Sequence, residues 1–474
     1  MLIIKDLSKR TLYNVLSKLV FSISFFVVNI IAANLLDPSE FGKSQYLVWF
    51  VYTSWLVLSF GLPTALTRFI PIASLQKLIS ITKSPVLIAL VIFLFCSFSL
   101  FTYFLFAEEM IVVWILFIGI AWSLVVNAFL EGYFLNRIHF VGSCSAAIII
   151  LFICVPLLKY VEIEGYYLLV ATYFIVYSIY GTWNLFEVLK SVASSALPEV
   201  TVKDFLQYSL LLWVITLFST LLWQRSEIVF IELYLSSVDI GYFSIGFMMA
   251  NIMVQFSGIF VSALLPYFSL NHSQLYSSFS KTIFRVNLKL IGWFSLFTMS
   301  LFIVNAQWII QYLFGKEYLD GYIACLLLMI SMPIASIGTV GSTVLKAIGR
   351  TKILLISNMV GLVIAFPLYY WVTRYYHLEG LLMARIFVLL LVVSIEAVYT
   401  YKQLNFATPL FHLVSFFGLS YALISAVFGF IGHTSLLEFI ILTVYTFAIY
   451  GVFSHLLHLL DFKDIRLLLF TGQN

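Results

Sequence analysis

Long apolar runs, almost free of charge, are the feature that most limits the fold of this 474-residue chain. Hydrophobic residues make up 63% of the sequence and charged residues only 10%, whereas a soluble domain usually has about a quarter charged residues. A run of about 20 apolar residues is long enough to cross a bilayer as a helix. A membrane barrel would instead alternate apolar and polar residues. The sequence therefore predicts an all-α polytopic membrane protein and excludes a disordered chain, a disulfide scaffold and a nucleic-acid-binding domain.

Apolar runs bounded by charges, Pro or Gly predict about fourteen transmembrane helices. Their approximate bounds are 11–36, 44–70, 84–106, 110–135, 141–159, 166–189, 205–233, 240–270, 283–314, 322–347, 353–372, 378–402, 408–431 and 436–459. The longest hydrophilic interruptions, near residues 190–204 and 271–282, have only about 15 residues. We therefore expect no inserted soluble domain.

The basic residues sort unequally onto the two sides of this arrangement. Of the 25 Lys and Arg residues, 19 fall on one side and four on the other, with Arg225 and Arg385 inside spans. Cytoplasmic loops retain Lys and Arg, so both termini are predicted to lie in the cytoplasm. If one helix had been missed, every later loop would be assigned to the wrong side of the membrane, and the basic residues would be mixed between the two sides. Their strongly unequal distribution therefore supports the number of predicted spans.

Two sequence echoes predict an internal repeat. Residues 36–42, after the first span, resemble residues 235–241, after the seventh, because each places an acid two residues before a Gly. Arg137, Pro156 and Glu164-Gly165 have counterparts in Arg350, Pro367 and Glu379-Gly380, in the same order. Transporters are often built from duplicated halves. We predict a lobe of six helices at 1–190, a cytoplasmic linker at 191–204, a second six-helix lobe at 205–402, and two further helices with a short cytoplasmic tail at 403–474.

Several short segments together resemble one transporter family. They are residues 35–42 (LLDPSEFG), 60–62 (FGL), 238–266 beginning VDIGYFS, 313–318 (LFGKEY), 346–352 (KAIGRTK) and 377–380 (HLEG). By their order and spacing, the chain resembles the polysaccharide biosynthesis transporters of the multidrug/oligosaccharidyl-lipid/polysaccharide superfamily, specifically Wzx-type O-antigen flippases. The resemblance extends over nearly the whole sequence.

This resemblance implies a V-shaped body of two six-helix lobes around a hydrophilic cavity that opens to one membrane face at a time. The implied cargo is an oligosaccharide on undecaprenyl pyrophosphate, moved from the cytoplasmic to the periplasmic leaflet of the bacterial inner membrane for lipopolysaccharide or other surface polysaccharide synthesis. The expected partners are this lipid-linked glycan, membrane lipid, a polysaccharide polymerase and a chain-length regulator. We expect a transporter rather than an enzyme, with no cofactor, and with proton or sodium coupling as an option.

Cationic side chains inside the membrane are the functional residues to seek, because the cargo carries a pyrophosphate. A planar guanidinium pairs with two phosphate oxygens, and a basic residue deep in a span is costly unless paired or functional. The candidates for substrate binding are Arg225, Lys18, Asn14, Arg68, Arg285, Lys289, Lys346 and Arg385.

Each of these residues also has a structural interpretation. Arg225 is equally well explained by an ion pair or by a position near the far interface, and Lys18 is close enough to the cytoplasmic end to snorkel. Arg285, Lys289 and similar residues at the cytoplasmic ends could form a basic entrance for the pyrophosphate, or could simply retain the topology and contact anionic lipid.

Three acids inside spans are candidates for ion coupling: Glu131, Glu227 and Glu396. On a helix Glu227 would lie about 200° round from Arg225, so each is expected to have another partner. Arg385 and Glu396 share a face three turns apart and are each expected to meet a charge on a neighbouring helix. Packing roles for Glu131 and Glu396 remain the alternative.

Two other functions remain open from the sequence. A drug exporter of the same superfamily would share the fold, although it would be expected to bury more acids and fewer cations. A polytopic glycan polymerase or glycosyltransferase normally has a large far-side loop or soluble domain, whereas the far-side loops here have about ten residues or fewer. The four Cys residues have no metal-site spacing, so no metal site is predicted.

Overall fold

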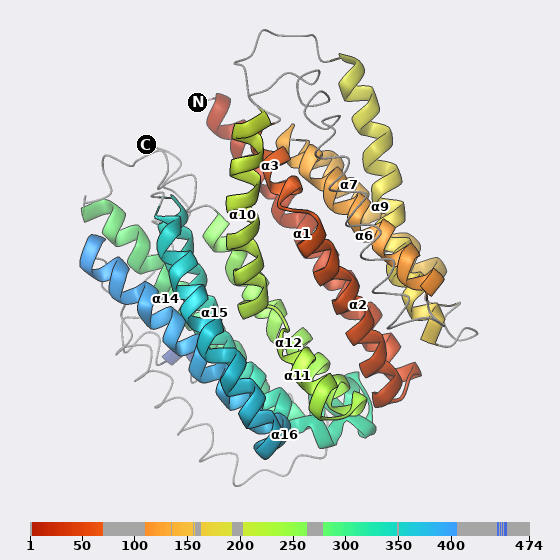
Figure 1. Ribbon diagram of the computed structural model, residues 1–474, viewed down its shortest axis with the longest axis vertical. Helices are drawn as coiled ribbons and strands as arrows, with labels where there is room; N and C mark the ends of the chain where they lie inside the picture. Colours follow the sequence, from red (N-terminus) through yellow and green to blue (C-terminus); the bar gives the residue numbers. More distant parts are fainter. Residues whose placement is uncertain are drawn as a thin grey trace. The chain divides into compact units, whose positions relative to one another are not determined.

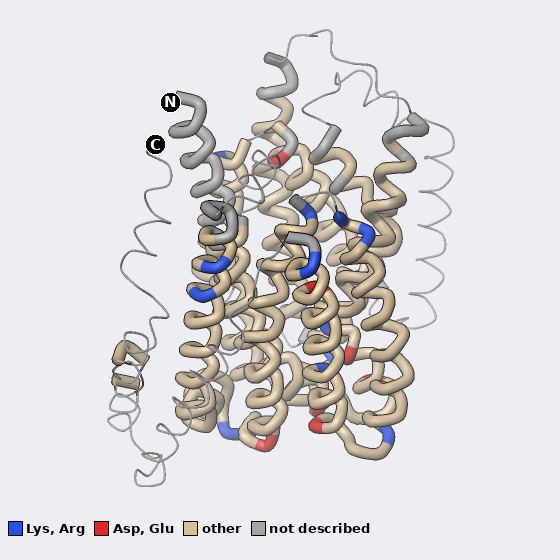
Figure 2. Tube along the Cα trace, turned by 90° about the vertical axis from the view of Figure 1, so that its left-hand side faces the viewer, with Lys and Arg blue, Asp and Glu red and all other residues tan. Residues whose placement is uncertain are grey.

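A computed structural model describes residues 2–69, 110–133, 135–154, 156, 163–191, 202–262, 278–347 and 350–404, with scattered residues between 443 and 452. Within those ranges the regular structure is helical and there is no strand. Seven of the described helices are long and apolar enough to cross a bilayer, or eight if one pair bent by 54° counts as a single span. Charged residues are sparse along them (Figure 2).

The predicted all-α polytopic fold is therefore confirmed, and the protein is a multi-pass membrane protein. The predicted spans at 84–106 and 408–431, and most of the span at 436–459, lie outside the described residues. The count of fourteen helices stays a prediction for that reason.

By its internal contacts the chain divides into two compact units, Met1–Thr220 and Leu221–Asn474. The division falls inside helix α10 (Val202–Trp223). Most of the linker predicted at 191–204 lies outside the described residues, and the predicted domain boundaries stay untested.

The first unit is a bundle of long helices that lie side by side (Figure 1). Its elements are α1 (Leu2–Leu35), α2 (Pro38–Leu58), α3 (Leu62–Phe69), α6 (Met110–Gly132), α7 (Asn136–Ile149), the π-helical turn η1 (Ile150–Cys154), α9 (Ile163–Ser191) and most of α10. Helix α6 packs on α2, α3 and α9, and α7 packs on α1 and α9. Gly181 of α9 lies directly against Val126 of α6, where an added Cβ would clash with the valine side chain. A larger residue at this position would therefore keep the two helices apart.

A buried polar cluster joins three helices of this unit. The amide of Gln45 on α2 donates to Oδ1 of Asn29 on α1 at 2.6 Å, and the hydroxyl of Tyr166 on α9 donates to the same oxygen at 2.8 Å. All three side chains are buried. In an apolar environment an unpaired amide is costly, so this cluster favours one register of α1, α2 and α9.

The second unit is organised around a central helix. Its elements are α11 (Glu227–Tyr234), α12 (Ser237–Ser262), α14 (Ser278–Leu313), the 3-10 helix η3 (Lys316–Gly321), α15 (Tyr322–Ala347) and α16 (Thr351–Leu404). Helix α15 packs on α12, α14 and α16. Helices α14, α15 and α16 run side by side in Figure 1. Gly246 of α12 allows a close approach to Cys325 of α15, whose Cα lies 2.9 Å from where a Cβ would be.

Helix α16 consists of two antiparallel helices with a sharp break at His377. The backbone of His377 has φ 55° and ψ −152° and is not helical. Ser357 donates a hydrogen bond to Glu396 at 3.0 Å, and Gly361 lies against Val392. In each pair, the two residues are equally far along the sequence from the point between residues 376 and 377, as expected for two antiparallel segments. The chain therefore reverses its direction at this break. The sequence predicted this boundary between its spans at 353–372 and 378–402.

Two of the predicted spans are interrupted in the structure, so the prediction that each is one continuous helix is wrong. The span predicted at 44–70 breaks at residues 59–61, between α2 and α3, and the span predicted at 205–233 breaks at residues 224–226, between α10 and α11. A side chain from a distant helix satisfies a carbonyl beside each break. Ser209 donates to the carbonyl of Phe60 at 2.6 Å, and Arg385 donates to that of Trp223 at 3.3 Å. Such bonds let a helix stop inside a membrane.

The first sequence echo marks equivalent helix starts. Asp37 caps α2 by accepting the backbone N–H of Glu40 at 2.8 Å. Before α12, Asp239 accepts the backbone N–H of Ser236 at 3.0 Å, and the Ser236 hydroxyl accepts that of Asp239 at 3.3 Å. Reciprocal bonds of this kind form a capping box. Each of the two similar segments therefore caps the start of a helix, one in each unit.

Candidate functional site: a polar pocket and two buried carboxylates

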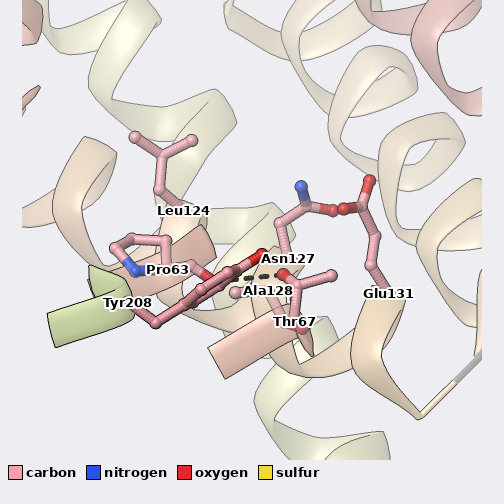
Figure 3. Close-up of a pocket in the computed structure, with 7 residues that line it drawn as sticks. All are labelled: Pro63, Thr67, Leu124, Asn127, Ala128, Glu131 and Tyr208. Atoms are coloured by element: carbon pink, nitrogen blue, oxygen red, sulfur yellow. Dashed lines mark hydrogen bonds between the residues drawn. The ribbon is translucent and has the colours of Figure 1, made fainter. Parts of the chain in front are cut away.

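The first unit contains a cavity of about 400 Å3 between α3, α6 and α10. Its lining residues are Pro63, Thr67, Leu124, Asn127, Ala128, Glu131 and Tyr208 (Figure 3). Asn127 and Glu131 are four residues apart on α6 and therefore project from one face of that helix. The pocket thus combines a carboxylate, an amide, a hydroxyl and a phenol with apolar walls.

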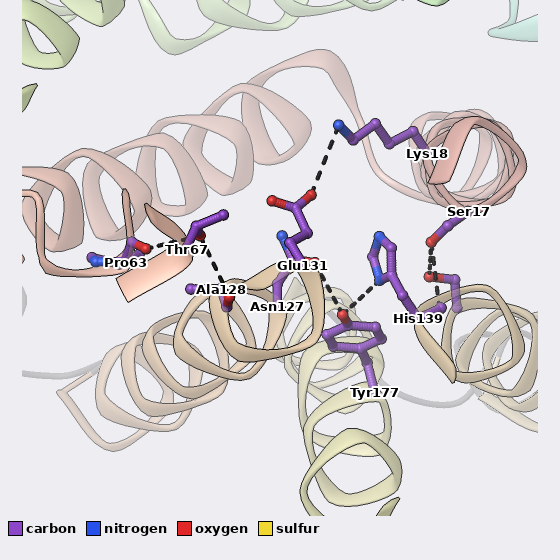
Figure 4. A network of polar contacts seen from close by, with 10 residues as sticks. Ser17, Lys18, Pro63, Thr67, Asn127, Ala128, Glu131, His139 and Tyr177 are labelled. Atoms are coloured by element: carbon purple, nitrogen blue, oxygen red, sulfur yellow. Dashed lines mark hydrogen bonds and ion pairs between the residues drawn. The ribbon is translucent and has the colours of Figure 1, made fainter. Parts of the chain in front are cut away.

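Glu131 makes a loose ion pair. Its Oε1 lies 3.9 Å from Nζ of Lys18 on α1, and the two side chains are 26% and 65% exposed. Ion pairs of this length between partly exposed groups contribute roughly 0 to 1 kcal/mol. Lys18 and Glu131, which the sequence proposed for different roles, are therefore neighbours at the edge of one pocket (Figure 4).

Behind the pocket, a chain of hydrogen bonds positions Asn127. Tyr177 of α9 donates to Oδ1 of Asn127 at 3.3 Å, and Nδ1 of His139 on α7 lies 2.6 Å from the same hydroxyl. When Tyr177 donates to Asn127, His139 is the donor to Tyr177. His139 and Tyr177 are both buried, so this chain is sheltered from solvent and fixes the amide orientation (Figure 4).

Two sequence candidates in this unit cannot be placed at side-chain level. Asn14 belongs to α1 and Arg68 to α3, but their side chains lie outside the described part of the structure. Their roles in substrate binding stay predictions.

In the second unit, a buried ion pair joins α11 to α16. The guanidinium of Arg385 donates through Nη1 to Oε1 of Glu227, and the two side chains are 2% and 0% exposed. The Tyr369 hydroxyl donates to the same carboxylate oxygen at 3.3 Å. Glu227 is also the first residue of α11, where the helix dipole favours a negative charge. The expectation that Glu227 and Arg385 each need a partner from elsewhere is confirmed, since they are partners of each other.

Arg225 lies in the break between α10 and α11. Its φ is 51°, in the left-handed region, so the helical angle of about 200° between Arg225 and Glu227 does not apply and that premise is wrong. The guanidinium carbon of Arg225 lies 4.7 Å from the centroid of the Phe247 ring, and that of Arg385 lies 5.5 Å from it. The side chain of Arg225 is half-buried, whereas Arg385 is enclosed.

The third candidate acid, Glu396, is 3% exposed and accepts a hydrogen bond from Ser357 through Oε1. Its Oε2 has no hydrogen-bond partner among the described residues. Glu396 also lines a cavity of about 20 Å3 with residues of α14, α15 and α16. That volume is about enough for one water molecule.

The remaining basic candidates lie near helix ends and are more open. Arg285 is exposed and Lys289 half-buried in the first part of α14, and Lys346 is exposed in the last turn of α15. Their proposed role as a basic entrance stays a prediction.

Sequence reasoning missed the uncharged members of the first site. It searched the spans for charges, and Asn127, Tyr177 and Tyr208 therefore went unnoticed. A signal was present for Asn127, because an amide four residues before Glu131 puts two polar groups on one face of an otherwise apolar helix.

A family model described as polysaccharide biosynthesis protein matches residues 7–272. The fold is similar to that of the lipid II flippase MurJ in an inward closed conformation, with a TM-score of 0.71 and 14% identity, covering 95% of this chain and 98% of that chain. An inward-facing multidrug resistance transporter of the MATE family matches with a TM-score of 0.62 and 12% identity, covering 81% and 94%. A point mutant of the Vibrio cholerae MATE transporter VcmN matches with a TM-score of 0.56 and 15% identity, covering 85% and 97%.

At these identities, the structural likeness shows the fold alone. No curated protein matches the chain in sequence. The resemblance stated from the sequence is confirmed by the family model, which matches more than half of the chain.

Proposed function

Because the chain belongs to the polysaccharide biosynthesis protein family, we propose that it is the flippase for an undecaprenyl-pyrophosphate-linked oligosaccharide. It transfers the repeat unit of an O-antigen or another surface polysaccharide from the cytoplasmic to the periplasmic leaflet by alternating access. The observation that carries this proposal is the family match over more than half of the chain. It is tested by following a lipid-linked glycan between the leaflets of vesicles that hold the purified protein.

A drug exporter is the alternative that the MATE likeness keeps open. Its cargo is often cationic and would need an unneutralised acid. In the part of the chain that the structure describes, Glu227 pairs with Arg385 and Glu131 with Lys18. Of the three candidate acids only the enclosed Glu396 has no ion pair among the described residues, and its cavity of about 20 Å3 is too small for a drug molecule, so these acids favour an anionic cargo over a cationic one. An enzyme of glycan assembly has less support, because the similar solved structures are those of transporters.

Arg225 is the residue we propose to hold the pyrophosphate in the second unit. It is half-buried in a helix break rather than enclosed like Arg385, and its fork suits two phosphate oxygens. Lys18, largely exposed on α1, supplies a second cation in the first unit. The end-of-helix residues Arg68, Arg285, Lys289 and Lys346 attract the anionic lipid at the cytoplasmic face.

Glu396 is the carboxyl we propose for proton coupling. Unlike Glu131 and Glu227, it has no ion pair among the described residues, and one of its oxygens is buried without a hydrogen bond. The group of opposite charge that faces it is Lys346 on α15, and the hydroxyl beside it is that of Ser357. A carboxyl with one unbonded oxygen beside a cavity that holds one water molecule is placed to take up and release one proton per cycle.

Replacing Glu396 by Gln should therefore uncouple transport from the proton gradient. We expect the variant to move cargo at one rate whether or not a pH difference is imposed across the vesicle, because the amide cannot titrate. The matched control is Glu379→Gln, an exposed acid on the same element, which should remain gradient-dependent. A Glu396→Gln protein that still responds fully to the gradient would rule out this assignment.

The protein is proposed to lie in the bacterial inner membrane with both termini in the cytoplasm. Cysteines introduced in place of the exposed residues Glu40 and Glu317 should react with an impermeant thiol reagent on intact spheroplasts, and those in place of Arg137 and Lys352 should not. The opposite labelling pattern would invert the proposed orientation.

The proposed partners follow from the cargo. A polysaccharide polymerase and a chain-length regulator would use the glycan once it reaches the periplasmic leaflet. The flippase itself needs only the lipid-linked glycan, the surrounding lipid and the coupling ion.

A further inference from the structure

The residues that line the polar pocket of the first unit are assigned no part in pyrophosphate binding or proton coupling above, although Lys18 at its edge is a proposed pyrophosphate ligand. We infer that the pocket is a subsite for the sugar units of the cargo, and this inference rests on the proposed function. Pockets that hold small ligands usually measure about 300 to 1,000 Å3. At about 400 Å3, the cavity has room for one or two sugar rings.

The polar groups of the pocket match a pair of neighbouring hydroxyls. Among the described residues, the side chain of Asn127 makes one hydrogen bond, which its oxygen accepts from Tyr177. Its NH2 group is left as a donor. Glu131 has Oε2 as an acceptor, since only Oε1 faces Lys18. A sugar hydroxyl both donates and accepts, so adjacent hydroxyls can bond to the amide and to the carboxylate one turn away.

The charge balance of the pocket favours a neutral ligand. Of the described residues that line it, only Glu131 is charged, and its partner Lys18 lies at 3.9 Å. A cationic drug would need a carboxylate without such a partner, and a phosphate would need more than this one ammonium group. A neutral polyhydroxylated molecule needs neither, because its bonds go to the amide, the carboxylate and the hydroxyl of Thr67.

The walls suit the apolar faces of a sugar ring. Pro63 and Leu124 line the cavity, and Tyr208 enters from α10 (Figure 3). Tyr208 also packs against the small hydrophobic cluster of Ala65, Leu66, Ala128 and Phe205. A tyrosine anchored in this way presents a large contact area with one polar end.

The amide is fixed in place before any ligand arrives. Tyr177 and His139 hold Oδ1 of Asn127 from behind, so its NH2 group does not need to be ordered on binding. Preorganised groups of this kind bind more tightly, because less entropy is lost. Thr67 is fixed similarly, since its hydroxyl donates to the carbonyl of Pro63 at 3.0 Å and keeps its lone pairs for a ligand.

Asn127→Ala tests the subsite with two probes. The first is the lipid-linked glycan extracted from cells that make the polysaccharide, and the second is bare undecaprenyl pyrophosphate. With the purified full-length protein, we expect the substitution to weaken binding of the glycan-bearing lipid about tenfold and to leave binding of the bare lipid unchanged. The matched control is Asn184→Ala, whose amide donates to the carbonyl of Tyr180 in its own helix.

The thermal unfolding midpoint shows whether Asn127→Ala is folded, and Asn127→Ser replaces it in the assay if it is not. Equal loss of both lipids, or no loss of either, would overturn the subsite. Equal affinity of the unaltered protein for the two lipids would overturn it as well, while leaving pyrophosphate transport in place. Binding of neither lipid by the unaltered protein would overturn the proposed function, and the sugar subsite with it.

Discussion

Replacing Arg385 by Ala should remove most of the folded protein from the membrane. The change leaves the carboxylate of Glu227 buried with no cation beside it and also removes the donor to the Trp223 carbonyl at the helix break. Breaking a buried ion pair by deleting one partner costs about 3 to 5 kcal/mol, which is a large part of the stability of a typical protein. The measurement is the amount of monodisperse protein after extraction, together with its thermal midpoint.

The double variant Arg385→Met with Glu227→Gln should recover much of this loss. It removes both charges, and the Gln can still accept from Tyr369. Arg374→Ala provides the control, because Arg374 is an exposed arginine on the same element. If Arg385→Ala is as stable as the Arg374 control, the pair does not hold α11 to α16.

Replacing Arg225 by Gly should stop glycan export while leaving the protein folded. Glycine adopts a φ of 51° without the steric cost of a side chain, which offsets the loss of the contact with the Phe247 ring, so the protein should remain folded. Export should fall at least about tenfold, as expected when a charged bidentate hydrogen bond worth roughly 1.5 to 3 kcal/mol is lost. Surface glycan is measured at matched levels of the protein in the membrane.

Arg225→Lys separates charge from geometry at this position. It keeps the cation and loses the planar fork, so we expect partial export, between that of the Gly variant and the unaltered protein. Arg225→Glu should be worse than Gly, because it places a negative charge where the pyrophosphate binds. Normal export by a stably inserted Arg225→Gly protein would remove Arg225 from the proposed site and leave the family assignment unchanged.

The fold class was predictable because it depends on quantities that add along the chain. Hydropathy set the helical membrane fold, and the boundary near His377 followed from the hydrophilic residues between two apolar runs. The matching helix starts at Asp37 and Ser236 were also accessible from sequence, since capping depends on residues three apart.

The helix breaks were not predictable in the same way. The segment 223–226 has neither Gly nor Pro, and its carbonyl partner is Arg385, 162 residues away in sequence. A break stabilised by such a distant side chain leaves no local signal. The break at residues 59–61 does have a local signal, because Gly61, with a φ of 71°, lies in it and Pro63 follows it, but Ser209, which satisfies the Phe60 carbonyl, is distant in sequence.

Only part of the polar pocket could be predicted from the sequence. Glu131 and Lys18 were found because they are charged, but nothing local indicates that α1 brings Lys18 to within 3.9 Å of Glu131. Asn127 becomes meaningful only when Tyr177 and His139, on two other helices, are seen to hold its oxygen.

Transfer of a lipid-linked glycan between leaflets is the measurement that tests the central claim most directly. The purified protein is reconstituted in vesicles with undecaprenyl-pyrophosphate-linked glycan, and the fraction open to an impermeant glycan-modifying enzyme is followed over time. The account predicts that this fraction rises faster than in protein-free vesicles, and that Arg225→Gly abolishes the difference. Glycan transfer at the protein-free rate, in vesicles whose protein exports a cationic dye, would contradict the account and identify a drug exporter instead.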